Sequence, residues 1–249
     1  MLTLVVEADR LQIVIPRTAR VTPGEMVFHV LNRGVGRRRL FTKPTDYEAF
    51  EEIIAETLEK RPPRIRACCL MPNHWHFVPW LERNDDLATF MQRLTVTHVT
   101  RRRKHRGGVG GGHVHQGRFK SFPVETDDHF YQFLRYVERN ALRAGLCRQA
   151  EEWRWGSVWR RIHGTLEQRR LLSGWPLPQP RQWIEHVNRP QGEAELDAIR
   201  RCVARGQPQG SAPCTEQSAR EPRLESTLRS RGRPRNPDSE PGHGYLETR

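Results

Sequence analysis

Two histidines separated by one tryptophan stand in the segment MPNHWHF, residues 71 to 77. Side chains alternate between the two faces of a β-strand, so we expect His74 and His76 on one face and Trp75 and Phe77 on the other. Two imidazoles on one face can bind a divalent metal if a further ligand or several waters complete the site. The histidines of such a pair are more commonly hydrogen-bonded residues of the surface or the core. A third ligand is therefore needed before the pair indicates a metal site.

A tyrosine and an asparagine supply further chemical groups in the segment YVERN. On a helix Tyr136 and Asn140 are about 40° apart, so a phenol and an amide oxygen would share one face. The phenol is a possible nucleophile and the amide oxygen a possible metal ligand. Tyr131 lies about 140° away from Tyr136 around the same helix, and we expect it to pack. Packing in the core is also the commoner use of a tyrosine such as Tyr136.

The elements that must position these groups can be predicted from apolar periodicity and turn residues. Strands are predicted at 26–34, 64–71, 74–81 and 117–125, and helices at 45–60, 86–106 and 127–145. The first six elements follow the order β-α-β-β-α-β, which is typical of a ferredoxin-like α+β fold. We therefore expect an antiparallel sheet with two helices on one face and the other face open, and the predicted helix at 127–145 is additional. Pro79 has no backbone N–H, which predicts a bulge or fraying in the third strand.

The charge of the chain indicates a polyanionic partner. The formal net charge is +13 and the isoelectric point is near 10.5. Nucleic acid is the simplest partner for such a surface. Arg118 and Lys120, two apart on a predicted strand, could both face a DNA backbone, although solvated surface charge explains them equally well. In the tail, Arg231 and Arg233 belong to RGRP, which resembles a minor-groove AT-hook core, with chance composition about as good an explanation.

Cysteine usage and hydropathy exclude several other classes. The five cysteines contain no CxxC spacing, which argues against a disulfide framework and a four-cysteine zinc site. A zinc site made of Cys68, Cys69, His74 and His76 is disfavoured because adjacent cysteines point to opposite faces of a strand. The chain has neither a membrane-length apolar run nor a basic leader, so we expect a cytoplasmic protein. A nucleic-acid partner would make it nucleoid-associated.

The chain divides by composition into four parts. We expect an N-terminal extension of uncertain structure at 1–20, a main folded domain at 21–163 that carries the residues named above, and a helical C-terminal extension at 164–205 that includes an amphipathic helix from 193 to 206. Residues 206–249 are rich in Arg, Pro and Gly and are expected to be mostly disordered. This tail carries seven Arg against six Asp and Glu, so the basic surface belongs mainly to residues 1–205.

Four collinear segments carry a family resemblance: NRG at the end of the first strand, MPNHWH, GRFKSFPVE and YVERNALRAGL. They resemble the single-tyrosine transposases of the IS200/IS605 type, and most of all the REP-associated tyrosine transposases, which are HUH endonucleases. The resemblance runs from about residue 16 to 165. WRWGSVWRR, WIEHVNRP and ESTLRSRGRPRN also resemble the C-terminal extension of that family.

The resemblance implies both a reaction and roles for the residues named above. It implies that Tyr136 is the nucleophile, and that His74, His76 and Asn140 bind Mg²⁺ or Mn²⁺. The implied reaction is cleavage of single-stranded or hairpin DNA through a 5′-phosphotyrosine intermediate, followed by strand joining, in a monomer or homodimer. The alternative is a non-catalytic nucleic-acid-binding protein derived from this family, which would use the open basic sheet face as RNA-binding ferredoxin-like modules do.

Overall fold

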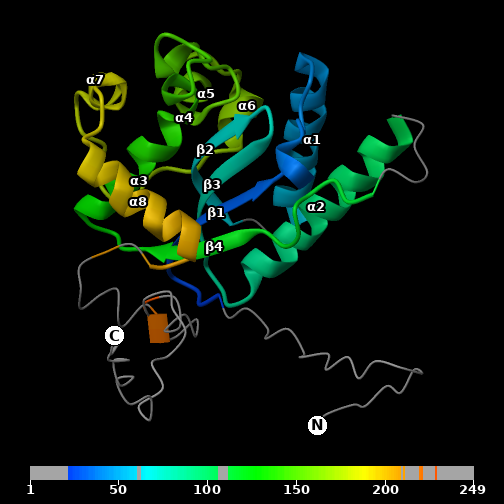
Figure 1. Ribbon diagram of the computed structural model, residues 1–249, viewed down its shortest axis with the longest axis horizontal. Helices are drawn as coiled ribbons and strands as arrows, with labels where there is room; N and C mark the ends of the chain where they lie inside the picture. Colours follow the sequence, from blue (N-terminus) through cyan, green and yellow to red (C-terminus); the bar gives the residue numbers. More distant parts are fainter. Residues whose placement is uncertain are drawn as a thin grey trace, which may run out of the picture.

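A four-stranded antiparallel sheet forms the centre of the computed structural model (Figure 1), which describes residues 22–60, 63–105 and 112–208 and positions 210, 219, 220 and 228. The strands β1 (Val27–Arg33), β2 (Arg64–Met71), β3 (His74–Trp80) and β4 (Lys120–Val124) lie in the order β2-β3-β1-β4. Helix α1 (Pro44–Lys60) connects β1 to β2, and α2 (Asp86–His105) connects β3 to β4. The predicted order of the first six elements is therefore confirmed.

Successive residues of the strands point to opposite faces of the sheet and are buried in two separate hydrophobic cores. The core beneath α1 and α2 takes Phe28 from β1 and Trp75 and Phe77 from β3, and all three are almost fully buried. The core on the opposite face takes residues such as Val27 and Phe122. The prediction that Trp75 and Phe77 face away from the two histidines is confirmed, because a strand alternates its side chains between its faces.

The second face of the sheet is covered, so the prediction of an open face is wrong. Helix α3 (Asp128–Glu138) contacts β2, β3 and β4. It buries Phe130, Phe133, Leu134 and Val137, which recur at helical spacing and form one apolar side. This apolar side packs against the sheet, where α3 contacts β2, β3 and β4. Figure 1 shows α3 on the side of the sheet opposite α1 and α2.

The predicted helix at 127–145 is divided at Arg139. Helix α3 ends at Glu138, and a short helix α4 (Asn140–Arg143) follows. Arg139 has φ −82° and ψ −1°, yet its N–H still donates to Arg135 O at 2.9 Å. Its side chain also donates to Val187 O and Asn188 O. The break is therefore slight, and Tyr136 and Asn140 remain one turn apart.

Helices from the C-terminal part of the chain share the core beneath α3. Helices α5 (Ser157–His163), α6 (Leu166–Arg170), α7 (Trp183–Asn188) and α8 (Glu193–Arg205) follow α4, and α8 matches the helix predicted at 193–206. Trp183 and Val187 of α7 and Leu196 and Ile199 of α8 are buried in this core. The 3₁₀ segments are Val35–Arg37 and Ala150–Glu152. None of the described helices has the length and apolar character needed to cross a membrane.

An irregularity in the sheet lies opposite Pro79. The pairing of β2 with β3 passes from Ile65↔Pro79 to Ala67↔Val78, so one residue of β2 is left over between the two pairs. Proline has no N–H to donate to the neighbouring strand, and a bulge interrupts the regular hydrogen bonding where that donor is missing. An irregularity therefore lies at Pro79 as predicted, but the extra residue is Arg66 of β2, and the predicted third strand itself continues without a bulge to Trp80.

Candidate active site and metal-binding residues

The two histidines of β3 lie on the sheet face that α3 covers. The ring centroids of His74 and His76 are 5.0 Å apart. The His76 ring is 6.2 Å from the ring of Tyr136, which comes from α3. His76 is 2% exposed and Tyr136 8% exposed. The structure thus brings the predicted nucleophile next to one of the predicted metal ligands.

Asn140 is joined to Tyr136 through Arg143. The Arg143 guanidinium lies 4.2 Å from the centroid of the Tyr136 ring, and its Nη2 donates to Asn140 Oδ1 at 3.0 Å. Tyr136 and Asn140 therefore both face Arg143, in agreement with the expected common helix face. Sequence reasoning did not single out Arg143, although its spacing of three from Asn140 is a contact spacing on a helix.

His29 is a second residue that sequence reasoning missed. Its Nε2 lies 2.7 Å from His76 Nδ1, and the two rings stack with centroids 5.0 Å apart. His29 is fully buried between Phe122 and Phe133, with ring centroids 4.9 Å and 4.6 Å away. If Nδ1 of His76 donates to His29, the lone pair of His76 Nε2 is left for a metal.

His74 is oriented by the turn that precedes it. Its Nδ1 lies 2.6 Å from Asn73 Oδ1, and the amide of Asn73 also donates to Arg37 O at 3.5 Å. An amide oxygen accepts, so His74 Nδ1 donates and its Nε2 keeps a lone pair. The backbone of this turn is held by Gly34, whose N–H donates to Asn73 O at 2.8 Å. Any Cβ at position 34 would lie 2.2 Å from Arg38 O, which explains the glycine of the NRG motif.

All three histidines of this cluster are neutral near pH 7. Burial lowers the pKa of His74 to about 4 and that of His29 to about 3, with positive charges nearby acting in the same direction. Burial, with His29, His74 and Arg143 close by, also lowers the pKa of His76 well below its usual value. A neutral imidazole is the form that binds a metal. The donor set of two neutral imidazoles and one amide oxygen therefore fits a divalent cation.

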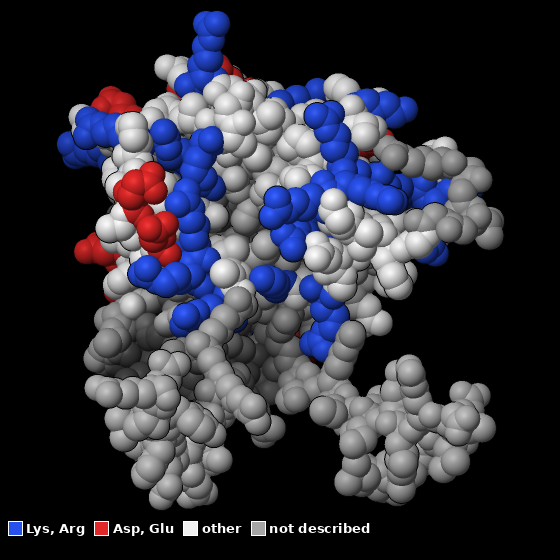
Figure 2. Space-filling model, viewed as in Figure 1, with Lys and Arg blue, Asp and Glu red and all other residues white. Residues whose placement is uncertain are grey.

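A cleft beside Tyr136 is lined by cationic side chains. It has a volume of about 350 Å³ and receives Arg33 from β1, Arg118 and Lys120 from the β4 region and Arg200 from α8. Lys120 Nζ also donates to Val203 O and Ala204 O at 3.4 and 3.2 Å, at the C-terminal end of α8. Figure 2 shows Lys and Arg side chains spread over the face that carries β4 and α8. Arg231 and Arg233 lie outside the described residues.

A second cluster that could hold a metal lies at the start of α3. Glu125, Asp127 and His129 bring their ligand atoms within 4.8 Å of one another. Asp127 already has a structural task, because its Oδ1 accepts from the backbone N–H of His129 at 2.8 Å and so caps α3. Helix capping thus accounts for the position of at least one member of this cluster.

Part of this chain is similar to known transposases. The sequence model of the family described as "Transposase IS200 like" matches residues 24–140. The chain is similar to a Haemophilus influenzae protein named "Putative REP-associated tyrosine transposase", with 25% identity over 131 residues, which are 49% of this chain and 74% of that protein.

Two solved structures are similar over part of the chain. One shows a REP-associated tyrosine transposase bound to a REP hairpin, with a TM-score of 0.47, 21% identity, and coverage of 59% of this chain and 83% of that one. The other is a tRNA(His) guanylyltransferase from Saccharomyces cerevisiae, with a TM-score of 0.35, 14% identity, and coverage of 68% and 86%. Both TM-scores are below 0.5.

Proposed function

We propose that the protein is a metal-dependent tyrosine endonuclease and strand transferase acting on single-stranded or hairpin DNA, because residues 24–140 match the IS200-like transposase family. The ferredoxin-like sheet and the added helix α3 form the proposed catalytic domain, residues 21–163. Residues 164–205 are its helical extension. The proposed setting is the cytoplasm, in association with the nucleoid, as a monomer or homodimer.

One observation supports this proposal above the others. The ring of Tyr136 lies near both the imidazole of His76 and the guanidinium of Arg143, and it lines a cleft with several cations. The guanidinium of Arg143, which is half-buried, packs over this ring. The arginine places positive charge beside a phenol that must lose its proton to act as a nucleophile.

The side chains around the cleft can be assigned roles in two steps of strand transfer. Arg33, Arg118 and Arg200 would bind phosphates of the single strand. The Tyr136 oxygen would attack the scissile phosphorus and release its proton to solvent. The bond from phosphorus to the 3′ oxygen would break, leaving a free 3′-hydroxyl and a 5′-phosphotyrosine. A 3′-hydroxyl would then attack the same phosphorus and release the tyrosine, so nothing is oxidised or reduced.

The metal would be held by Nε2 of His74, Nε2 of His76 and Oδ1 of Asn140. Mg²⁺ or Mn²⁺ bound there supplies polarisation of the scissile phosphate and neutralises charge that develops on its oxygens. The Asn140 oxygen has two lone pairs, so its hydrogen bond from Arg143 does not prevent it from acting as a ligand. Arg143 would hold the amide in place for this task.

The proposal is tested by covalent adduct formation on hairpin DNA. Purified protein is incubated with end-labelled single-stranded hairpins from the flanks of its gene, with Mg²⁺, Mn²⁺ or EDTA, and separated on a denaturing gel. We expect a metal-dependent protein–DNA adduct that Tyr136→Phe abolishes. Tyr131→Phe is the matched control, because Tyr131 lies on the same helix and its hydroxyl donates to Pro178 O at 2.7 Å. Equal binding by all three proteins without cleavage would favour the non-catalytic nucleic-acid-binding protein.

A further inference from the structure

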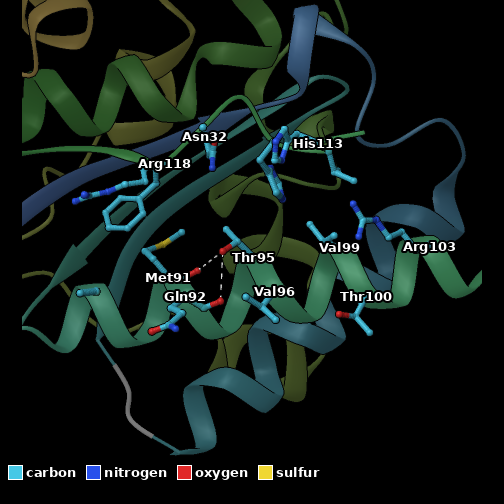
Figure 3. A pocket seen from close by; sticks show the side chains of 15 residues that line it. Asn32, Met91, Gln92, Thr95, Val96, Val99, Thr100, Arg103, His113 and Arg118 are labelled. Atoms are coloured by element: carbon cyan, nitrogen blue, oxygen red, sulfur yellow. Dashed lines mark hydrogen bonds between the residues drawn. The ribbon is translucent and has the colours of Figure 1, made fainter. Parts of the chain in front are cut away.

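A second cavity lies next to the cleft, between α2 and the segment 112–119. Its volume is about 680 Å³, within the range of roughly 300–1,000 Å³ that is typical of small-ligand sites. Figure 3 shows Thr95 and Val99 reaching from α2 toward Asn32 and His113 on the other side of the cavity. Neither the two histidines of β3 nor Tyr136 lines this cavity, so it is not part of the reacting centre.

The walls of this cavity are mainly apolar, with polar groups at defined points. Met91, Val99, Val114 and Phe119 contribute apolar surface. Val96 lines it while 58% exposed, and it is one of the few large apolar side chains of the described part that face solvent. Such surface favours a ligand with a flat apolar body, and a nucleobase stacked against an aromatic ring is one.

The rim of the cavity is cationic and can donate hydrogen bonds. Arg103 and Arg118 lie at the rim and are exposed. Arg118 has no hydrogen-bond or ion-pair partner in the part of the chain that the structure describes. Asn32 Oδ1 accepts from Arg33 N at 2.8 Å, so its NH₂ group is the part of the amide that can donate to a ligand. An apolar slot with arginines at its mouth matches one base flanked by two phosphates.

The cavity also adjoins the cleft beside Tyr136. Asn32 and Arg118 line both spaces. Single-stranded DNA whose scissile phosphate lies at Tyr136 would therefore pass Arg118 and reach the cavity within a short distance. We propose that this cavity holds an unstacked nucleobase of the single-stranded DNA next to the scissile phosphate, with Phe119 as its stacking surface. This inference rests on the proposed function for the identity of the strand.

Photocrosslinking tests the position of the base directly. A single-stranded oligonucleotide from the gene's flank carries 5-iododeoxyuridine at one position at a time and is bound to the Tyr136→Phe protein in EDTA. After irradiation, crosslinked peptides are mapped by mass spectrometry. We expect one nucleotide position to crosslink to residues 88–103 or 112–119. Crosslinks that map only to other parts of the chain would overturn the proposal.

An abasic substitution at the crosslinking position tests whether the base contributes to affinity. Loss of a stacked base should weaken binding by about 5- to 150-fold in the otherwise unmodified protein. Phe119→Leu keeps an apolar side chain but removes the ring, so the abasic penalty should shrink. An unchanged penalty in Phe119→Leu would contradict the role of Phe119, and no penalty in either protein would overturn base binding.

These measurements separate this inference from the proposed enzymatic function. They need neither metal nor cleavage, so crosslinks within the cavity can appear even if no tyrosine adduct ever forms. Those results together would support the base site and contradict the endonuclease proposal. Conversely, a Tyr136 adduct together with crosslinks elsewhere would support the endonuclease and overturn the base site.

Discussion

His76 is contacted by His29, and this contact determines which nitrogen of His76 can face a metal. The two nitrogens are 2.7 Å apart, and His29 has no exposed surface. A fixed Nδ1–H on the ligand histidine raises metal affinity because it sets both the ring orientation and the tautomer. His29 is therefore a positioning residue in the proposed metal site.

Replacing His29 should weaken metal binding without removing a ligand. His29→Phe fills a similar space among aromatic rings but cannot accept from His76. We expect Mn²⁺ affinity, measured by titration calorimetry, to fall by about 10- to 100-fold. His163→Phe, which removes an exposed imidazole on α5, is the matched control. Equal Mn²⁺ affinity in both variants and the unmodified protein would show that His29 does not orient the site.

His115 makes the stability of the fold depend on pH. Burial, with Arg102 nearby, lowers the pKa of His115 to about 4, and its Nε2 lies 3.1 Å from His98 Nδ1. The unfolded chain binds a proton near pH 6.5, whereas the folded chain resists protonation down to about pH 4. Stability contributed here is thus present above pH 6.5 and is lost as the pH falls toward 4.

The His115→Gln variant should show a weaker pH dependence. Across this window one histidine changes the unfolding free energy by up to about 1.4 kcal/mol per pH unit. Urea unfolding at several pH values should give a smaller decrease for His115→Gln than for the unmodified protein. Identical pH slopes for the two proteins would mean that His115 titrates normally in the folded state.

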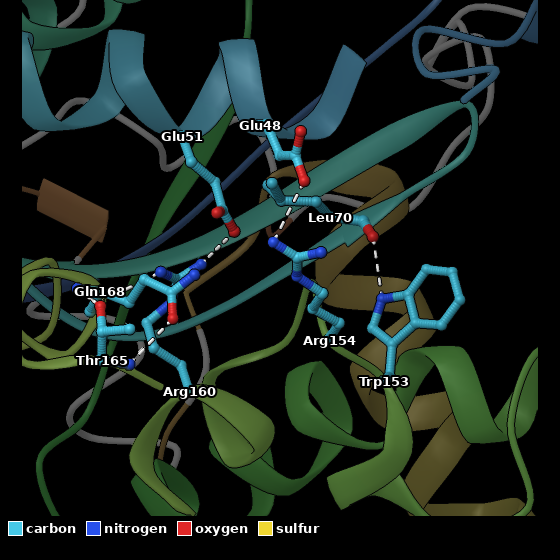
Figure 4. A network of polar contacts seen from close by, with 8 residues as sticks. All are labelled: Glu48, Glu51, Leu70, Trp153, Arg154, Arg160, Thr165 and Gln168. Atoms are coloured by element: carbon cyan, nitrogen blue, oxygen red, sulfur yellow. Dashed lines mark hydrogen bonds and ion pairs between the residues drawn. The ribbon is translucent and has the colours of Figure 1, made fainter. Parts of the chain in front are cut away.

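Helix α5 is fixed to α1 by a buried ion pair. Figure 4 shows Arg160 directed at Glu51 and, a short distance away, Arg154 directed at Glu48. The side chains of Arg160 and Glu51 are 2% and 10% exposed, whereas those of Arg154 and Glu48 are 44% and 41% exposed. Removal of one partner of a buried pair leaves an uncompensated charge, while an exposed pair contributes little.

These two pairs give a controlled comparison. We expect Arg160→Met to lower the free energy of unfolding by about 3–5 kcal/mol and Arg154→Met by about 0–1 kcal/mol. Denaturant unfolding followed by tryptophan fluorescence measures both. Similar losses for the two variants would indicate that the pair between α5 and α1 does not anchor the helix.

The elements themselves were largely predictable from the sequence. The predicted strand at 64–71 coincides with β2, and the predicted strand at 74–81 differs from β3 by one residue. Alternation and the Pro72-Asn73 turn determine these bounds locally. The covered second sheet face was not predicted because it depends on where α3 packs. His29 was missed for a related reason: its contact with His76 depends on the β1–β3 register, Leu31↔His76, which no local pattern reveals.

At the scale of the whole molecule, the positive charge should determine how strongly DNA binding depends on salt. The net charge is +13, and the cleft beside Tyr136 receives Arg33, Arg118 and Arg200. Each phosphate contact adds about 0.7 to the slope of log affinity against log salt for a single strand. Arg118→Gln should therefore reduce that slope by about 0.7.

Fluorescence anisotropy over a series of NaCl concentrations measures this slope. Arg93→Gln is the matched control, because Arg93 is an exposed arginine of α2 that lines neither cavity. Equal slopes for Arg118→Gln, Arg93→Gln and the unmodified protein would place Arg118 away from the DNA. The basic composition predicted a polyanionic partner, but only the fold shows which arginines share a cleft with Tyr136.

The central claim is that Tyr136 becomes covalently attached to DNA, and mass spectrometry tests it most directly. Trypsin cuts after Arg135 and Arg139, so Tyr136 falls in a peptide of its own, separate from Tyr131. The protein is incubated with flank-derived hairpin DNA and Mg²⁺ or Mn²⁺, treated with nuclease and digested. We predict a nucleotide attached through phosphate to the peptide 136–139 and no such adduct with EDTA. An unmodified peptide 136–139 in a sample that has cut the DNA, or an adduct on Tyr131, would contradict the assignment.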